Sequence, residues 1–191
     1  MTQARTELAG EPGEEAEDAA LVARWQAGDE RAATALVARH AAALARFVGG
    51  LGERSEAEEL VQDTFVRAFQ ALDGFRAESS LRTWLFTIAR RLVLDRRRAG
   101  ARRRAREVDD PDADVATEHT ALDAVVADET EGRLRHALAR LTPMQREVFT
   151  LRVTEGRSYR DIAAIAGTTE GSARVHYHNA VRAIQEHLDD G

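Results

Sequence analysis

The 191-residue sequence contains no cysteine, which excludes disulfide bonds, thiolate nucleophiles and cysteine-based zinc sites. It also lacks lysine, so all 27 basic residues are arginine. Aromatic residues make up only 5%, so any core must consist mainly of Leu, Val, Ile and Ala. No apolar run approaches the ~20 residues of a membrane span, and the acidic residues 1–20 do not resemble a signal peptide. We expect a cytoplasmic protein of one or two small domains.

The net charge of −6 is distributed very unevenly along the chain. Residues 1–18 carry six acids and one arginine, and residues 107–131 carry ten acids and no base. Nine arginines lie between Arg90 and Arg106, where Asp95 is the one acid. Such segregation suggests contact with a polyanion at the basic stretch. A solvated helix end followed by a disordered acidic linker explains the charge equally well.

Strand signals are nearly absent, whereas helical periodicity and capping residues recur, so we predict an all-α fold. Four helices are expected in the first half of the chain, each with a polar capping residue at its start. They are residues 18–28, residues 29–50, a helix from the capping box Ser55–Glu58 to about Leu72, and a helix capped by Ser79 or Ser80 that continues into the arginine cluster.

The composition divides the chain into two helical lobes. Residues 1–18 are expected to form an acidic disordered tail, and residues 99–128 a linker, which leaves domains at 19–98 and 129–191. Four helices are expected in the second lobe. They are residues 132–141, a helix opened by the box Thr142–Gln145, residues 159–166 capped by Ser158 and ended by Gly167, and a last helix from Thr169 or Glu170 to about Leu188.

The last two helices have the layout of a DNA-binding helix-turn-helix. At 100° per residue the final helix has an inner stripe of Ala173, Tyr177, Ala180, Ile184 and Leu188. Its opposite face carries Val175, Asn179 and Arg182, and Asn and Arg can make bidentate contacts to base edges. Ser172 and the free amides of the first turn suit phosphate contacts. A plain helical hairpin in a bundle has the same spacing.

Two features of the first lobe are also open to two interpretations. The helix at 59–69 leaves its polar residues outward, either as ordinary solvated surface or as a docking face for a protein. The polar loop 75–80 precedes Trp84 and an arginine run, which permits stacking on unpaired bases. Simple core packing also explains Trp84, and we favour that reading, with one edge of the ring exposed.

Four motifs give the chain a family resemblance. They are ELVQDTFVRAF (59–69), FRAESSLRTWLFTIARR (75–91), LTPMQREVFTLR (141–152) and SYRDIAAIAGTTEGSARVHYHNA (158–180). In this order they resemble bacterial RNA polymerase sigma factors of the sigma-70 family. Residues 21–98 are similar to region two and residues 134–188 to region four. The short length and the direct linker resemble the extracytoplasmic-function subgroup.

The resemblance implies a promoter-specificity subunit whose partners are core RNA polymerase, promoter DNA and an anti-sigma factor. It also implies no membrane insertion, no enzymatic activity and no cofactor or metal. The family docks on the clamp helices of the largest subunit and on the flap. The implied clamp-binding residues are Glu59, Gln62, Asp63 and Arg67. Those for the minus-ten element are Arg76, Glu78, Ser79, Ser80, Trp84, Arg90 and Arg91. Those for the minus-thirty-five element are Arg160, Ser172, Arg174, Val175, His178, Asn179 and Arg182.

This sequence departs from the family pattern in two places. The last helix has Thr168, Ala173 and Tyr177 at usually aliphatic positions, and His176 and Asn179 where arginine is usual. Arg91 stands where the family often has asparagine.

A second hypothesis is a dimeric helix-turn-helix regulator that binds duplex DNA without polymerase. Such a regulator has no need of the 59–69 face or the 75–84 loop. An enzyme is disfavoured because no nucleophile–base pair, metal cluster or glycine-rich phosphate loop appears.

Overall fold

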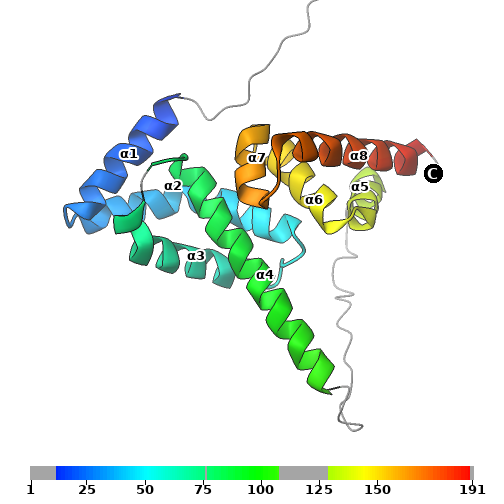
Figure 1. Cartoon of the computed structure of the whole chain (residues 1–191), viewed down its shortest axis with the longest axis horizontal. Coiled ribbons are helices and arrows are strands. Elements are labelled where there is room, and N and C mark those ends of the chain that lie inside the picture. Colours follow the sequence, from blue (N-terminus) through cyan, green and yellow to red (C-terminus); the bar gives the residue numbers. More distant parts are fainter. Residues whose placement is uncertain (1–11, 76, 108–128, 190–191) are drawn as a thin grey trace, which may run out of the picture.

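The computed structural model describes residues 12–75, 77–107 and 129–189, and every regular element in these ranges is helical (Figure 1). The predicted all-α class is therefore confirmed. The N-terminal lobe contains α1 (Pro12–Gln26), α2 (Glu30–Gly50), α3 (Ala57–Ala71), the short 3₁₀ helix η1 (Leu72–Gly74) and α4 (Leu81–Glu107). The C-terminal lobe contains α5 (Glu129–Arg140), α6 (Pro143–Phe149), the π-helical turn η2 (Thr150–Thr154), α7 (Tyr159–Ala166) and α8 (Glu170–Asp189).

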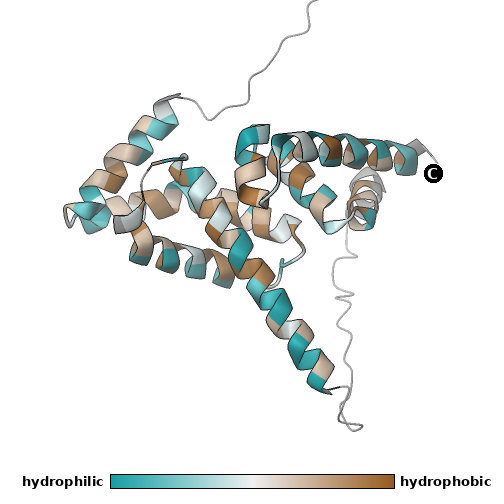
Figure 2. Ribbon diagram, viewed as in Figure 1, coloured by the Kyte–Doolittle hydropathy of each residue, from teal (hydrophilic) through white to brown (hydrophobic). Residues whose placement is uncertain are grey.

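The N-terminal lobe is built around the apolar faces of α2, α3 and α4. Phe47 of α2 and Phe86 of α4 are both completely buried, and their rings meet edge to face with centroids 4.9 Å apart. Leu60 of α3 completes this centre. Beyond Val93 the sequence of α4 becomes arginine-rich, and Figure 2 shows that half of the helix as largely hydrophilic. The first half of α4 therefore fixes the lobe, and the second half projects charge into solvent.

The first helix begins earlier than the sequence predicts. We expected residues 1–18 to be a disordered tail, but α1 starts at Pro12. Asp18 is buried on this helix, where Oδ2 lies 3.0 Å from Nε2 of His40 and Oδ1 accepts a 2.9 Å hydrogen bond from Arg39. Burial by itself raises the pKa of Asp18, but His40 and Arg39 together lower it below its ordinary value. These polar contacts fasten an otherwise acidic segment to α2.

Replacing Asp18 with Asn is expected to lower the free energy of unfolding by about 1–2 kcal/mol at neutral pH. Because the pKa of Asp18 is depressed in the folded chain, its contribution is present above the ordinary carboxyl pKa and is lost as pH falls through the folded value. Urea unfolding at several pH values should show the two proteins converging in acid. Glu17→Gln, which removes an exposed partner of Arg39, should change little. Equal stability at neutral pH would contradict this role.

The predicted caps of α6 and α7 are confirmed, and the predicted capping box of α3 is wrong. The Thr142–Gln145 capping box is present, with both reciprocal hydrogen bonds, and Ser158 accepts from the amide of Asp161. Gly167 ends α7 with φ 65°, a left-handed conformation that favours glycine. The predicted Ser55–Glu58 box is wrong, because α3 begins at Ala57 with Glu56 at the N-cap position and no side-chain cap hydrogen bond.

The arginine cluster continues α4 through residues that we expected in the linker. The helix runs to Glu107, whereas the linker was expected from residue 99. The rest of that expected linker, 108–128, and the first 11 residues of the expected tail lie outside the described residues.

The two lobes are in direct contact along α4 (Figure 1). α7 packs against α4, and η2 lies against α2. Leu151, Ile162 and Ile165 of the C-terminal lobe are buried in the same apolar cluster as the N-terminal core. A smaller cluster within the C-terminal lobe joins α5 to α8 through Ala137, Leu141, Ala180 and Ile184.

Candidate polymerase and nucleic-acid interface

The polar face of α3 is open to solvent along its whole length. Glu59, Gln62, Asp63 and Arg67 are all exposed, whereas the opposite face of the helix is buried in the N-terminal core. Glu59 accepts a 3.0 Å hydrogen bond from Arg96 of α4. The structure therefore brings the four predicted clamp-binding residues together on one accessible, mainly acidic surface.

The loop before α4 forms a recess of about 410 Å³. Phe75, Glu78, Ser79 and Trp84 line it, together with Gly74. The rings of Phe75 and Trp84 pack with centroids 5.0 Å apart, and Trp84 is half-buried, as expected for a core residue with one exposed edge. The recess offers an aromatic wall beside carboxylate and hydroxyl groups, which suits a planar heterocycle.

The backbone of this loop is held in an unusual conformation. Ala77 has φ 53°, in the left-handed region that non-glycine residues rarely adopt. Strain of this kind persists when surrounding contacts impose it and is concentrated at binding sites. At the end of the loop Ser80 accepts a 3.2 Å hydrogen bond from the amide of Thr83 and caps α4. Arg76, the remaining predicted loop residue, lies outside the described residues.

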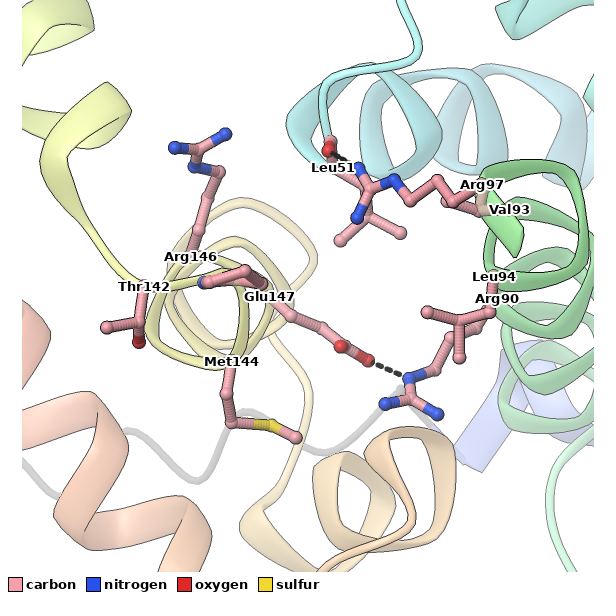
Figure 3. A pocket seen from close by; sticks show the side chains of 10 residues that line it. Leu51, Arg90, Val93, Leu94, Arg97, Thr142, Met144, Arg146 and Glu147 are labelled. Atoms are coloured by element: carbon pink, nitrogen blue, oxygen red, sulfur yellow. Dashed lines mark hydrogen bonds and ion pairs between the residues drawn. The ribbon is translucent and has the colours of Figure 1, made fainter. Parts of the chain in front are cut away.

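Two arginines predicted to contact the minus-ten element lie in different environments. Arg91 is exposed. Arg90 is turned toward the C-terminal lobe, where its Nε donates a 2.5 Å hydrogen bond to Glu147 (Figure 3). Burial raises the pKa of Glu147, while the positive charge of Arg90 opposes that shift. In this arrangement Arg90 is not available to a phosphate.

The outer face of α8 is exposed as the helical period predicts. Arg174, Val175, His178, Asn179 and Arg182 are all exposed on it, and Val175 is 58% exposed. The inner stripe begins at Ala173 and includes Ala180, both completely buried. Arg160 of α7 is exposed as well. The helix-turn-helix thus presents a continuous polar surface with an apolar side chain at its centre.

Several of these groups are already oriented by neighbours. Arg174 stacks on the ring of Tyr159 at 4.7 Å and lies 3.6 Å from Glu170. The backbone amide of the half-buried Ser172 donates a 3.1 Å hydrogen bond to Oγ1 of Thr169. Stacking restricts the guanidinium of Arg174, which lowers the entropy cost of binding a phosphate or a base edge.

The acidic residues that join the lobes were missed by sequence reasoning. Glu147, Glu155 and Asp161 each contact the N-terminal lobe. The sequence holds 33 acidic residues, and no local period distinguishes these three. Glu147 and Glu155 are buried, which the sequence alone does not show.

Neither a metal site nor a membrane-spanning helix is present in the part of the chain that the structure describes. No group of three or more His, Cys, Asp or Glu side chains there is placed to hold a metal ion. No described helix has the length and apolar character needed to cross a bilayer.

Comparison with known families matches both lobes. Sigma-70 region 2 matches residues 36–103, and sigma-70 region 4 matches residues 131–184. The chain belongs to the sigma-70 family. The exposed face of α3 and the recess before α4 thus lie in region 2, and the helix-turn-helix lies in region 4.

Curated sigma factors match nearly the whole length of this sigma-70 chain, and several of them are named extracytoplasmic-function (ECF) factors. It is 32% identical to the RNA polymerase sigma-H factor of Pseudomonas aeruginosa, over 90% of this chain and 94% of that protein. It is 30% identical to the ECF RNA polymerase sigma-E factor of Haemophilus influenzae, over 92% and 97%. The Escherichia coli sigma-E factor is 31% identical over 90% and 94%.

Two solved structures have a similar fold. CnrH, in complex with the cytosolic domain of CnrY, is similar with a TM-score of 0.65 and 29% identity, covering 91% of this chain and 98% of that one. The Bartonella quintana sigma factor RpoE, in complex with the anti-sigma factor NepR, has a TM-score of 0.61 and 32% identity, with coverage of 82% and 96%.

Proposed function

We propose that this chain is a sigma subunit that binds core RNA polymerase, recognises minus-ten and minus-thirty-five elements and nucleates promoter melting. The observation that carries the proposal is the presence of regions 2 and 4, in that order, on a chain whose curated ECF relatives match it over nearly its full length. The exposed face of α3 and the recess before α4 support it further, since a regulator acting alone needs neither.

The exposed face of α3 binds the polymerase. Glu59, Gln62, Asp63 and Arg67 contact the clamp helices of the largest subunit, while region 4 contacts the flap. Charged and polar groups on an exposed surface speed and orient encounter with a complementary partner. The mainly acidic character of this face suits a basic patch on the clamp.

The recess and the arginines of α4 bind the minus-ten element and melt it. Extruding one base costs a few kcal/mol of stacking and pairing. Stacking beside Trp84 and hydrogen bonds with Glu78, Ser79 and Ser80 offset that cost. Arg76 and Arg91 bind the backbone of the separated strand, with Arg90 once it is released from Glu147. Strand separation here needs binding energy and no covalent step.

Region 4 reads the minus-thirty-five element through the major groove. The N-terminal half of α8 supplies Arg174, Val175, His178 and Asn179, and Arg182 follows one turn later. Arg160 and Ser172 bind flanking phosphates. The relatives solved with anti-sigma proteins support an inhibitory protein partner for this chain as well.

The proposal is tested by transcription in vitro with core polymerase and a genomic template library. The purified chain should direct initiation at a discrete set of start sites that share two upstream elements. Core polymerase alone is the control. Specific duplex binding without any transcription would instead favour the helix-turn-helix regulator.

Asn179→Ala is expected to lose about 1–3 kcal/mol of base discrimination within the minus-thirty-five element, because an asparagine amide can pair with adenine at two atoms. Competition between promoters that differ at single positions measures this loss. Gln185→Ala, on an exposed part of α8 outside the proposed contact set, is the matched control. Unchanged sequence preference would show that Asn179 does not read bases.

A further inference from the structure

The C-terminal end of α4 extends beyond the packed body of the N-terminal lobe (Figure 1). Val93 is the last residue of this helix in the apolar core, whereas every described side chain from 101 to 106 is exposed. Figure 2 shows the same stretch as mainly hydrophilic. Residues 98–106 are called here the basic arm. Its arginines are all exposed, and they are Arg98, Arg102, Arg103, Arg104 and Arg106.

Most arginines of the basic arm have no acidic partner among the side chains that the structure describes. Arg98 lies 3.1 Å from Asp95, but within this set no other arginine of the arm pairs with a carboxylate. Nearer the core, Arg96 and Arg97 are both paired with glutamates of the N-terminal lobe. Cations stabilise the C-terminus of a helix only in its last turn. Arg98 and Arg102 lie before that turn, so stabilising the helix end does not explain them.

One face of α4 connects the recess to the basic arm. At 100° per residue, five side chains fall within about 40° of a single line along the helix. They are Trp84, Arg91, Arg98, Arg102 and Arg106. Arg103 and Arg104 lie about 100° and 160° away from this line. The side of α4 that lines the recess therefore continues as a row of arginines, and Arg98, Arg102 and Arg106 are called here the arm face.

The direction of the basic arm on promoter DNA follows from the path of the chain. Under the proposed function Trp84 lies at the edge of the melted minus-ten element, and region 4 binds an element centred about 25 base pairs, or roughly 85 Å, upstream. The arm leads into the 21 residues that connect α4 to α5. A stretch of that length can bridge such a gap when the arm points upstream, whereas an arm that points downstream would lengthen the gap by about 30 Å. The arm therefore points along the spacer between the two elements.

Backbone phosphates of the spacer duplex lie within reach of the arm face. Arg98 and Arg106 are about 21 and 33 Å from Trp84 along the helix axis. These distances correspond to roughly 6–10 base pairs of B-DNA, which carries one negative charge per about 1.7 Å. Arginine binds phosphate oxygens with two parallel hydrogen bonds, and such contacts hold the duplex without reading its sequence.

We infer that the arm face binds backbone phosphates of the spacer duplex, roughly 6–10 base pairs upstream of the melted edge, as a third promoter contact that does not depend on sequence. This inference rests on the proposed function. It extends that function to a part of α4 to which neither the recess nor region 4 gives a role. The arm face holds the upstream duplex in line with α4 while the recess holds the separated strand.

The test compares two pairs of arginines on the same stretch of helix. Arg102→Gln with Arg106→Gln removes two charges from the arm face, and Arg103→Gln with Arg104→Gln removes two charges from other sides of the arm. All four side chains are exposed, so neither pair should affect folding. Each pair includes one arginine of the last turn, which matches the effect on the helix terminus.

Promoter binding by the holoenzyme is measured at several salt concentrations, on a promoter recovered from the genomic-library transcription. The Arg102/Arg106 variant should bind at least about tenfold more weakly at about 0.1 M salt. The slope of log K against log salt should become shallower by about 1.8, because two phosphate contacts are lost. The Arg103/Arg104 variant should bind like the natural chain.

A promoter that carries neutral methylphosphonates in the spacer, roughly 6–10 base pairs upstream of the melted edge, identifies the partner. On this DNA the natural chain and the Arg102/Arg106 variant should bind equally well, because the charge that the arm face binds has been removed. Their affinities for core polymerase without DNA should also be equal.

Asp95→Asn should have the opposite effect. Asp95 pairs with Arg98 and lies on the same side of α4, so it both occupies an arginine of the arm face and repels phosphate. The variant should bind the promoter about threefold more tightly. Loss of fold cannot mimic a gain in affinity.

Equal losses from the two arginine pairs would overturn the assignment to one face, and no loss from either would remove the arm from the promoter complex. A loss that persists on the methylphosphonate promoter, or that appears with core polymerase alone, would assign the arm to a protein partner and contradict the inference. If the natural holoenzyme starts no RNA, the proposed function fails. In that case a selective loss of nonspecific duplex binding by the free Arg102/Arg106 variant would still show that the arm face binds DNA, and its absence would overturn the inference as well.

Discussion

Phe86→Ala is expected to lower the free energy of unfolding by about 3–5 kcal/mol. Phe86 is completely buried and packs edge to face on Phe47, so its removal leaves a cavity where α2 and α4 meet. That loss is a large share of the ~5–15 kcal/mol that stabilises a typical domain. Urea unfolding followed by helical circular dichroism measures it.

Val153→Ala is the matched control for Phe86→Ala. Val153 is 54% exposed, so its truncation should change stability by no more than about 0.5 kcal/mol. A similarly small effect at Phe86 would mean that the centre of the N-terminal lobe is not packed as described.

Replacing both Gln62 and Asp63 with alanine should weaken association with core polymerase by about thirtyfold, the effect of losing roughly 2 kcal/mol at an interface centre. Both side chains are exposed and contribute nothing to the core, so helical content should stay unchanged. Binding is measured by competition with a labelled chain for core polymerase.

Gln70→Ala provides the comparison on the same helix, since Gln70 is exposed but lies outside the proposed docking set. It should bind polymerase like the natural chain. Equal affinity of the Gln62/Asp63 double variant would remove the docking role from this face. Loss of helical content would instead show that these residues support the fold.

Local signals in the sequence predicted the helices well where one residue decides the geometry. Thr142 caps α6 and Gly167 ends α7 because their side-chain and backbone preferences act within one turn. The Ser55 box failed because α3 begins at Ala57, with Glu56 at the N-cap position and no side-chain cap hydrogen bond. A cap motif alone therefore does not determine the start of a helix.

The relation between the lobes could not be predicted from sequence. The Arg46–Glu155 pair joins residues 109 positions apart, and Arg90 and Glu147 are 57 apart. Periodicity identifies which side of a helix is apolar but not which other helix covers it. The period of α8 correctly placed Ala173 and Ala180 inside, since that prediction needed one helix only. Arg90 was predicted to contact promoter DNA, but its partner in the structure is Glu147, which only the tertiary fold brings near it.

The length of α4 sets where the chain leaves region 2. Because the helix continues to Glu107, the chain leaves region 2 about 13 Å beyond residue 98. The 21 residues from 108 to 128 can span at most about 70 Å. A rigid arm followed by this stretch gives a maximum reach close to the spacing of two promoter elements. Lengthening or shortening either piece would therefore alter which spacer lengths the holoenzyme accepts.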